Sequence, residues 1–374
     1  MGLYINPGNE NFRFIVNDEY IDKSGLISVI NSTIDTKSML SCVSRPRRFG
    51  KSYAANMLAA YYDCSCDSHE LFEGLNIAKD SGFEKYINKF NVLYLDITGF
   101  LGDTTLEGLP VYIRKEVLED AEQVFPDMKP ADSVKKCLAR IVEETGKKFI
   151  AIIDEWDSPI RDSDTTAKIQ KDYLEFLRSL FKSDITKRVF SAAYMTGILP
   201  IKKDGSQSAI SEFMEYSILD TGEFAPYTGF TVEDVKSICS KKDVPFGQMR
   251  DWYNGYELYR EDGEKISVYN PNSVLLAARK GKFKSYWGQS AAVNSALEYV
   301  NMDFDGLGAA MEKLTAGLEI PVKTQKFQND LVSFRSADDV LTLLIHFGYL
   351  NYDSEKETIR IPNYEIQSEF GDMI

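Results

Sequence analysis

Three consecutive residues, Gly50, Lys51 and Ser52, have the types and order needed to bind a phosphate group. They lie between an apolar run at 38–43 and an amphipathic segment at 53–62, so we expect a strand, a loop and a helix. Free backbone N–H groups and the positive end of the helix dipole favour an anion at such a helix start. There, the lysine would contact the β- and γ-phosphates, the serine would ligate Mg²⁺, and the glycine would let the backbone approach phosphate oxygens.

The match to the phosphate-loop pattern is incomplete, because Arg45 stands five residues before Gly50, where a glycine is usual. The tripeptide alone is weak evidence, and a chance occurrence on a surface loop is the alternative. The residues that we predict to contact the nucleotide are Arg47, Arg48, Phe49, Gly50, Lys51, Ser52 and Tyr53.

The helix prediction depends on large apolar side chains that recur at helical spacing on one face, with no Gly or Pro between them. These residues are Tyr53, Met57, Leu58 and Tyr61.

A second candidate site follows the apolar run 149–153, which is typical of a strand buried on both faces of a parallel sheet. Asp154 and Glu155 then emerge at the carboxyl end, where ligands bind in open α/β sheets. Phosphoryl transfer to water needs an acid that holds Mg²⁺ and a group that orients the water, and we assign these roles to Asp154 and Glu155. Two solvated acids at the end of a core strand are the alternative, but the Gly-Lys-Ser segment upstream favours the functional interpretation.

Other polar residues could complete such a site. The strand predicted at 189–195 ends at Thr196, which we expect to sense the γ-phosphate, although a turn-forming Thr-Gly pair explains it almost as well. Lys202, Lys203 or Arg178 could supply further positive charge, and each of them taken singly is more simply a solvated surface residue.

The remaining pattern predicts two domains, a nucleotide-binding α/β domain at 1–224 and a mainly helical region at 225–374. We expect further elements of the first domain as a strand at 91–95, helices at 103–125 and 131–145, and a short strand near 216–219. We expect elements of the second as helices at 273–279 and 337–346 and a hairpin formed by 349–353 and 358–362. A helix followed by such a hairpin indicates a winged-helix-like element, and its mixed charge favours protein or intradomain packing over DNA.

Composition limits the class of protein. The sequence has 374 residues, of which 44% are hydrophobic and 27% charged, as in an ordinary globular protein. A net charge of -14 argues against a protein that coats nucleic acid, although a local basic patch stays open. Five cysteines without a paired framework, no signal peptide and no membrane-spanning run lead us to expect a cytoplasmic protein that does not enter a membrane.

In combination, these motifs closely resemble the bacterial AAA-ATPase-like family, and the resemblance covers nearly the whole chain. The segments that carry it are 20–23, 45–52, 95–96, 153–157, 195–197, 252–256, 269–273 and 361–365. The phosphate loop of that family also reads Arg-Pro-Arg-Arg-Phe-Gly-Lys-Ser, so the resemblance implies that Arg45 is a family trait.

The resemblance implies a P-loop NTPase parallel sheet of the additional-strand type, with strand order 5-1-4-3-2. Gly50, Lys51 and Ser52 would then follow strand 1, Asp154 and Glu155 would end strand 3, and Thr196 would end strand 4. Members of the family often continue into a nuclease domain of the PD-(D/E)XK superfamily. This sequence ends at Ile374, so we expect either a truncated form or a chain without that effector, and we assign no residue a nuclease role.

We therefore expect a Mg²⁺-dependent module that binds and hydrolyses ATP and couples its nucleotide state to the C-terminal helical region. The catalytic candidates are Glu155, Lys51 and Thr196, and the metal ligands are Ser52 and Asp154. A nucleotide-binding switch or an interaction scaffold with little or no hydrolysis is the alternative. The protein could bind a protein partner or form a homo-oligomer, and the net charge does not support binding to nucleic acid. The sequence does not decide between ATP and GTP.

Overall fold

The structure is a computed structural model, and it describes residues 1–182, 185–201, 203–204, 207–208, 210–287, 304, 306–327, 329, 331 and 334–373. By its internal contacts the chain forms two units. The first unit contains Met1–Val43 and Lys51–Glu215, and the second contains Ser44–Gly50 and Tyr216–Ile374. The segment between the first strand and the first long helix therefore belongs, by its contacts, to the second unit.

A five-stranded sheet organises the first half of the chain. Its strands are β1 (Leu40–Ser44), β2 (Asn91–Asp96), β3 (Phe149–Asp154), β4 (Phe190–Gly197) and β7 (Met214–Tyr216). Their order is β7-β1-β4-β3-β2, which is 5-1-4-3-2 when the five strands are counted along the chain. This order confirms the predicted additional-strand P-loop topology.

Strand β3 is the centre of the predicted chemistry, and all six of its residues are buried. It pairs in parallel with β2 from Asn91 opposite Phe149 to Asp96 opposite Asp154, and it also pairs in parallel with β4. The apolar body of β3 is thus covered as predicted, and two aspartates lie side by side at its carboxyl end.

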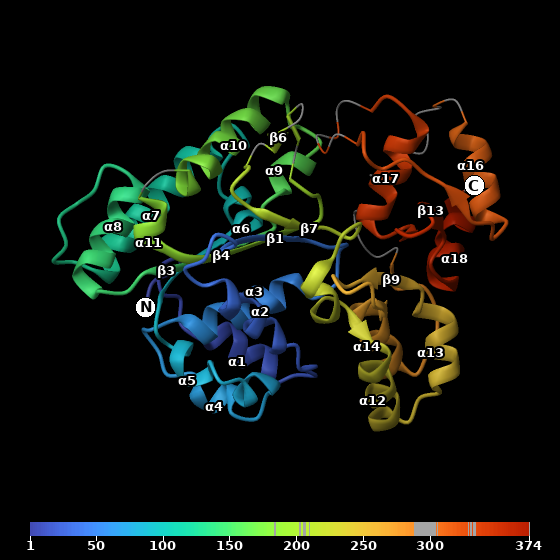
Figure 1. Cartoon of the computed structure of the whole chain (residues 1–374), viewed down its shortest axis with the longest axis horizontal. Helices are drawn as coiled ribbons and strands as arrows, with labels where there is room; N and C mark the ends of the chain where they lie inside the picture. The colour runs from blue at the N-terminus through green and yellow to red at the C-terminus, as the bar shows by residue number, and fades with distance from the viewer. Residues whose placement is uncertain are drawn as a thin grey trace. The chain divides into compact units, whose positions relative to one another are not determined.

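Helices cover both faces of this sheet (Figure 1). Helix α3 (Lys51–Tyr62) packs on the face that it shares with α1 (Glu10–Val16) and α2 (Gly25–Thr33). The opposite face carries α6 (Ile97–Leu101), α9 (Ser158–Arg161) and α10 (Ala167–Phe181).

The predicted apolar stripe of α3 is correct at three positions and wrong at the fourth. Met57, Leu58 and Tyr61 are buried, whereas Tyr53 is 51% exposed. The inward position of the first turn belongs to Lys51, and a residue two places further along a helix points about 200° away from it. Tyr53 is therefore directed to the surface beside the start of the helix.

The other elements of the first unit are short, apart from two longer helices. These elements are α4 (His69–Phe72), the 3-10 helix η1 (Asn76–Lys79), α5 (Phe83–Tyr86), α7 (Leu109–Val124), α8 (Val134–Thr145), α11 (Thr186–Val189), β5 (Lys203–Asp204) and β6 (Gln207–Ser208). The helix predicted at 103–125 begins only at Leu109, where Pro110 occupies the first turn. Residues 103–108 form turns instead, and the short helix α6, whose first backbone N–H groups are capped by Asp96, precedes them.

The second unit contains helices and two small three-stranded sheets. Its helices are the 3-10 helix η2 (Gly222–Tyr227), α12 (Val232–Lys242), α13 (Phe246–Tyr253), α14 (Pro271–Lys280), α16 (Leu307–Thr315), α17 (Ala337–Phe347) and α18 (Tyr364–Met373). Its sheets have the orders β8-β10-β9 and β11-β13-β12. The strands are β8 (Phe230–Thr231), β9 (Tyr256–Tyr259), β10 (Lys265–Tyr269), β11 (Ile320–Pro321), β12 (Asn351–Asp353) and β13 (Thr358–Arg360).

The end of the chain forms the elements expected of a winged-helix-like region. Helix α17 is followed by the antiparallel hairpin of β12 and β13, close to the predicted bounds, and β11 adds a third strand. In the part of the chain that the structure describes, no helix is both long and apolar enough to cross a bilayer.

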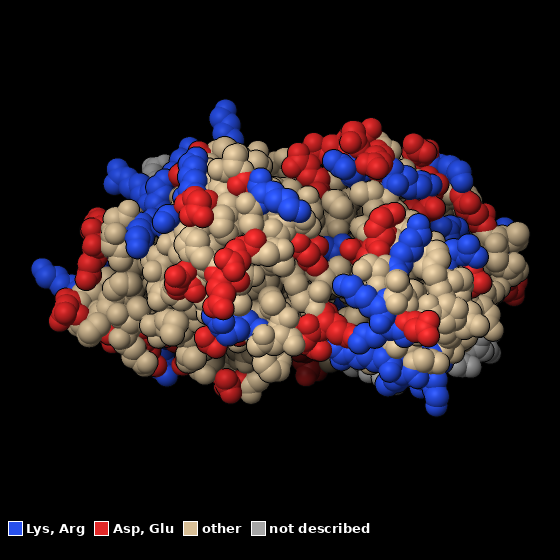
Figure 2. Space-filling model, turned by 90° about the horizontal axis from the view of Figure 1, so that it is seen from below, with Lys and Arg blue, Asp and Glu red and all other residues tan. Residues whose placement is uncertain are grey.

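Acidic and basic side chains are interspersed on the face shown in Figure 2, with a group of basic side chains at its lower right. Exposed basic residues occupy the last turns of two helices in the second unit, where they complement the helix dipole. They are Lys241 and Lys242 on α12, and Arg279 and Lys280 on α14.

Glu365 is a buried carboxyl group that ties α18 to α14 within the second unit. Its Oε1 accepts hydrogen bonds from the Ser273 hydroxyl at 2.9 Å and from the Tyr286 backbone N–H at 2.8 Å. Burial raises the pKa of Glu365 from its ordinary value of 4.5 to about 7, although these hydrogen bonds oppose the shift.

We predict that Glu365→Gln abolishes part of the pH dependence of stability. Because the folded carboxyl holds its proton up to a higher pH than the unfolded one, the free energy of unfolding falls as pH rises from about 4.5 through about 7. In urea denaturation, the free energy of unfolding of the variant minus that of the wild type should therefore increase by up to roughly 3 kcal/mol between pH 5 and pH 8. Glu312→Gln, at an exposed position on α16, is the control. If the free energy of unfolding of Glu365→Gln and of the wild type changed with pH in parallel, the raised pKa of Glu365 would be contradicted.

Candidate functional site

Lys51 and Ser52 occupy the first turn of α3, directly after the loop that follows β1. The side chain of Lys51 is only 3% exposed, and its Nζ lies 3.4 Å from Oε1 of Glu155. Ser52 is exposed, and its side chain acts on the Asp154 carboxyl group, whose pKa it lowers against the effect of burial. The predicted phosphate-binding and metal-binding side chains of the first unit are therefore next to one another.

Asp154 is the last residue of β3 and is 3% exposed. Burial raises the pKa of Asp154 to about 6, while the hydrogen bond from Ser52 acts in the opposite direction. Its Oδ1 also accepts the backbone N–H of Glu155 at 3.0 Å. A hydroxyl and a carboxylate that already meet in this way fit the incomplete protein ligand set that Mg²⁺ uses when phosphate and water supply the rest.

Glu155 directly follows β3 and has a left-handed backbone, at a φ of 51°. Non-glycine residues adopt this conformation rarely and at a cost of about 1 kcal/mol or more, which surrounding contacts must offset. Both carboxylate oxygens have a cationic neighbour, because Oε1 faces Lys51 and Oε2 accepts a 2.6 Å hydrogen bond from Arg161. The carboxylate is thus held between two buried cations beside the start of α3.

Thr196 lies at the end of β4 and is fully buried. Its hydroxyl donates a 2.9 Å hydrogen bond to the backbone carbonyl of Val43 on β1, and its own carbonyl accepts the N–H of Trp156 at 3.1 Å. Thr196 therefore links the ends of three strands, and its role as a γ-phosphate sensor stays a prediction.

Arg45 replaces the first glycine of the usual phosphate loop, and within the second unit it is fully buried. Its Nε donates to the Thr228 hydroxyl at 2.8 Å, and its Nη1 donates to the carbonyls of Ser44 at 2.8 Å and Tyr216 at 2.7 Å. The side chain therefore organises the base of the loop, a role that a glycine cannot fill.

The rest of the loop is held by further contacts within the second unit. Arg48 Nη1 donates to the Tyr286 carbonyl at 2.8 Å, and the Phe49 carbonyl accepts the N–H of Gly229 at 3.0 Å. The Arg47 carbonyl accepts from the Asn270 side chain at 3.3 Å.

Gly50 has a φ of 86°, and nothing lies within 4 Å of the position that a Cβ would take. The requirement for glycine there is therefore conformational rather than a matter of space.

The structure reveals two site residues that the sequence interpretation missed, Asp157 and Arg161. Asp157 is fully buried, and its Oδ2 accepts the Arg161 Nε at 2.7 Å. Their spacing of four residues on a short helix carries no signal that distinguishes them from an ordinary surface pair. Of the other predicted cations, Lys202 lies outside the described residues, the Lys203 side chain is not described, and Arg178 is half-buried on α10.

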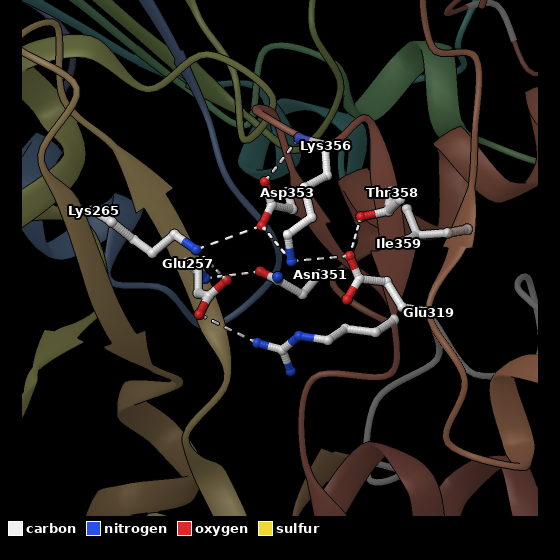
Figure 3. Close-up of a pocket in the computed structure, with 9 residues that line it drawn as sticks. Glu257, Lys265, Glu319, Asn351, Asp353, Lys356, Thr358 and Ile359 are labelled. Atoms are coloured by element: carbon white, nitrogen blue, oxygen red, sulfur yellow. Dashed lines mark hydrogen bonds and ion pairs between the residues drawn. The ribbon is translucent and has the colours of Figure 1, made fainter.

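A separate charged cavity of about 140 Å³ lies within the second unit (Figure 3). Glu257, Lys265, Glu319, Asn351, Asp353, Lys356, Thr358, Ile359 and Arg360 line it. Its three carboxylates pair with its three cations, for example Lys265 with Glu257 at 3.1 Å and with Asp353 at 3.5 Å. Since the charges compensate one another across the β9–β10 hairpin and the β12–β13 hairpin, we interpret this cavity as a structural junction.

Comparison with known families agrees with this geometry. The profile of the AAA-ATPase-like family, described as predicted AAA-ATPase, matches residues 7–206. The chain belongs to this family, and the matched part contains the phosphate loop, Asp154, Glu155 and Thr196.

Similarity to individual proteins is low. An uncharacterized protein from the vnfD 5' region of Azotobacter chroococcum mcd 1 is 24% identical over 377 residues, which cover 95% of this chain and 66% of that protein. A Walker-type ATPase of Pyrococcus abyssi is 12% identical with a TM-score of 0.44, and covers 93% of this chain and 94% of its own. The ORC2 protein of Aeropyrum pernix, solved as ADPNP-ADP complexes, is 10% identical with a TM-score of 0.40, over 96% of this chain and 97% of its own.

We predict that Arg45→Gly, which restores the usual loop residue, destabilises the protein. The change removes a buried guanidinium and leaves the Thr228 hydroxyl and two carbonyls without its hydrogen bonds, at a cost of roughly 3 kcal/mol. The thermal midpoint should fall by roughly 5 °C or more. Arg250→Ala, which removes an exposed arginine from α13, is the matched control, and an equal midpoint for Arg45→Gly and the wild type would show that the buried contacts are unimportant.

Proposed function

We propose that this chain is a Mg²⁺-dependent, cytoplasmic ATPase module whose nucleotide site is formed around the start of α3. The observation that carries the proposal is the meeting of Lys51 and Ser52 with Glu155 and Asp154 at the carboxyl end of β3. Membership of the AAA-ATPase-like family and the sheet order support it. Two acids, a lysine and a hydroxyl in this setting are the groups that nucleoside triphosphate hydrolysis uses.

Each residue has a distinct part in the proposed reaction. Lys51 and the backbone of the loop bind the β- and γ-phosphates, and the exposed Tyr53 offers a ring beside them. Glu155 orients the attacking water. The water oxygen forms a bond to the γ-phosphorus, the bond to the bridging oxygen breaks with its electrons on ADP, and the water proton passes to Glu155 and then to solvent.

Ser52 and Asp154 would hold Mg²⁺, which, when bound, supplies charge neutralisation at the β- and γ-phosphates. The influence of the Ser52 side chain on the pKa of Asp154 supports the assignment, since it places the two side chains near one another.

The loop suggests how nucleotide binding is coupled to the second unit. Arg45, Arg48 and Phe49 make their hydrogen bonds to residues of that unit, and the chain enters the first unit at Lys51. A phosphate that changes the conformation of this loop would alter those contacts. We therefore propose that ATP and ADP favour different arrangements of the hydrogen bonds that Arg45, Arg48 and Phe49 make.

The proposed partner is a protein or a second copy of this chain. The net charge of -14 and the mixed surface in Figure 2 do not favour a nucleic-acid coat.

A nucleotide-binding switch with little hydrolysis is a second candidate, and one observation favours it. Each oxygen of Glu155 already has a cationic partner, Lys51 or Arg161, so the carboxylate is not open to an attacking water in this arrangement. Phosphate release by the wild-type chain separates the two candidates.

We predict that Lys51→Ala abolishes stabilisation by ATP. Ligand bound only to the folded state at about 100 times its dissociation constant adds about 2.7 kcal/mol, so the wild-type midpoint should rise by several degrees with ATP and Mg²⁺. The variant should show no such rise, because it lacks the cation that contacts the phosphates. Lys136→Ala on the surface of α8 is the control, and a Lys51→Ala variant with an undiminished rise would exclude this phosphate site.

We predict that Glu155→Gln retains the ATP-dependent rise and lowers phosphate release by roughly 100-fold or more, because glutamine keeps the shape but cannot take up the proton. Loss of the ATP-dependent rise in this variant would instead make Glu155 a structural residue.

A further inference from the structure

Arg161, the last residue of α9, joins two carboxylates of the candidate site. Its Nε lies 2.7 Å from Oδ2 of Asp157, and its Nη2 lies 2.6 Å from Oε2 of Glu155. Only 10% of the side chain is exposed, so both contacts are largely shielded from water. A planar guanidinium suits this arrangement, because its donors point to two acceptors in fixed directions.

Asp157 holds the guanidinium of Arg161 in a fixed position. In addition to Arg161, its Oδ2 accepts the backbone N–H groups of Ile198 at 3.1 Å and Leu199 at 2.8 Å. These two residues directly follow β4, so the aspartate is bound to the backbone at the end of the neighbouring strand. The position of the guanidinium is therefore set by the sheet and does not depend on Glu155.

The two contacts of Glu155 differ in strength. The hydrogen bond to Arg161 is short, whereas Lys51 lies 3.4 Å from the other oxygen. A triphosphate carries several negative charges and would compete for Lys51 more effectively than one carboxylate. Oε1 would then be released, while Oε2 stays on Arg161.

We propose that Arg161 is a positioning residue for the catalytic glutamate: it holds Oε2 of Glu155, so that Oε1, released by Lys51 when ATP binds, receives the proton of the attacking water. This role rests on the proposed ATPase function, and it adds a nucleotide-dependent exchange of ion pairs to it. Without ATP, each oxygen of the Glu155 carboxylate contacts a cation. With ATP, one cation moves to the phosphates and the other keeps the carboxylate in place.

The test compares turnover with binding. Arg161→Ala should lower kcat for phosphate release by about 10-fold or more, and should leave KM and the ATP-dependent rise in thermal midpoint within about 2-fold of the wild type. In a Glu155→Gln background, Arg161→Ala should lower kcat no further, because it acts through the carboxylate that is already lost. Arg13→Ala, which removes an arginine paired with Glu10 at 3.8 Å, is the matched control and should change none of these values.

A conservative variant tests the same role if Arg161→Ala fails to fold. Arg161→Lys keeps the charge but can reach only one of the two carboxylates well, so it should restore folding while kcat stays at least about 5-fold below that of the wild type.

Each other result would overturn the role. A wild-type kcat in Arg161→Ala would show that Glu155 needs no such support. A raised KM with a lost ATP-dependent rise would show that Arg161 contacts the nucleotide, as would a further fall in the Glu155→Gln background. A wild-type chain that gains stability from ATP but releases no phosphate would reject hydrolysis and this role together, whereas a chain with normal turnover and an unaffected Arg161→Ala variant would reject only the role of Arg161.

Discussion

A chain of alternating charges, Lys51, Glu155, Arg161 and Asp157, is the constraint on which the candidate site depends. Three of these side chains are at least nine-tenths buried, and Glu155 is 23% exposed. Buried charges are tolerated only when they are paired, and removing one partner of such a pair typically costs about 3–5 kcal/mol. These paired charges therefore fix the end of β3 against the first turn of α3 and against the residues that follow β4. Under the proposed function, a triphosphate would replace the contact between the Lys51 ammonium group and the Glu155 carboxylate.

The loop before α3 shows a second constraint. In the usual phosphate loop, glycines allow the backbone to wrap around phosphate, whereas Arg45 here is a buried structural residue. Its guanidinium satisfies carbonyls and a hydroxyl within the second unit, and Gly50 alone supplies a left-handed glycine before the lysine. The loop thus has its base fixed by side-chain hydrogen bonds, and the residue directly before the lysine adopts a left-handed conformation that favours glycine.

Much of this arrangement could be predicted from the sequence. The all-apolar body of β3 can be satisfied only by burial on both faces, which fixes a covered parallel strand and places Asp154 and Glu155 at its end. The resemblance to the AAA-ATPase-like family then supplied the strand order. The surface position of Tyr53 was not predicted, because the apolar period of α3 alone does not show that Lys51 faces inward. Asp157 and Arg161 were missed for other reasons. The backbone of Ile198 and Leu199 reaches Asp157 only after β3 and β4 have paired, and the six-residue spacing of Glu155 and Arg161 does not itself indicate a contact.

The central claim is that this site binds one ATP, and direct calorimetric titration of the purified full chain with ATP in the presence of Mg²⁺ tests it most directly. We predict saturable binding of one nucleotide per chain that is strongly weakened when EDTA removes the metal, because in the proposed site Asp154 contacts the nucleotide through Mg²⁺. A folded chain that takes up no ATP under these conditions would contradict the account, and binding that is equally tight with EDTA would contradict the metal assignment.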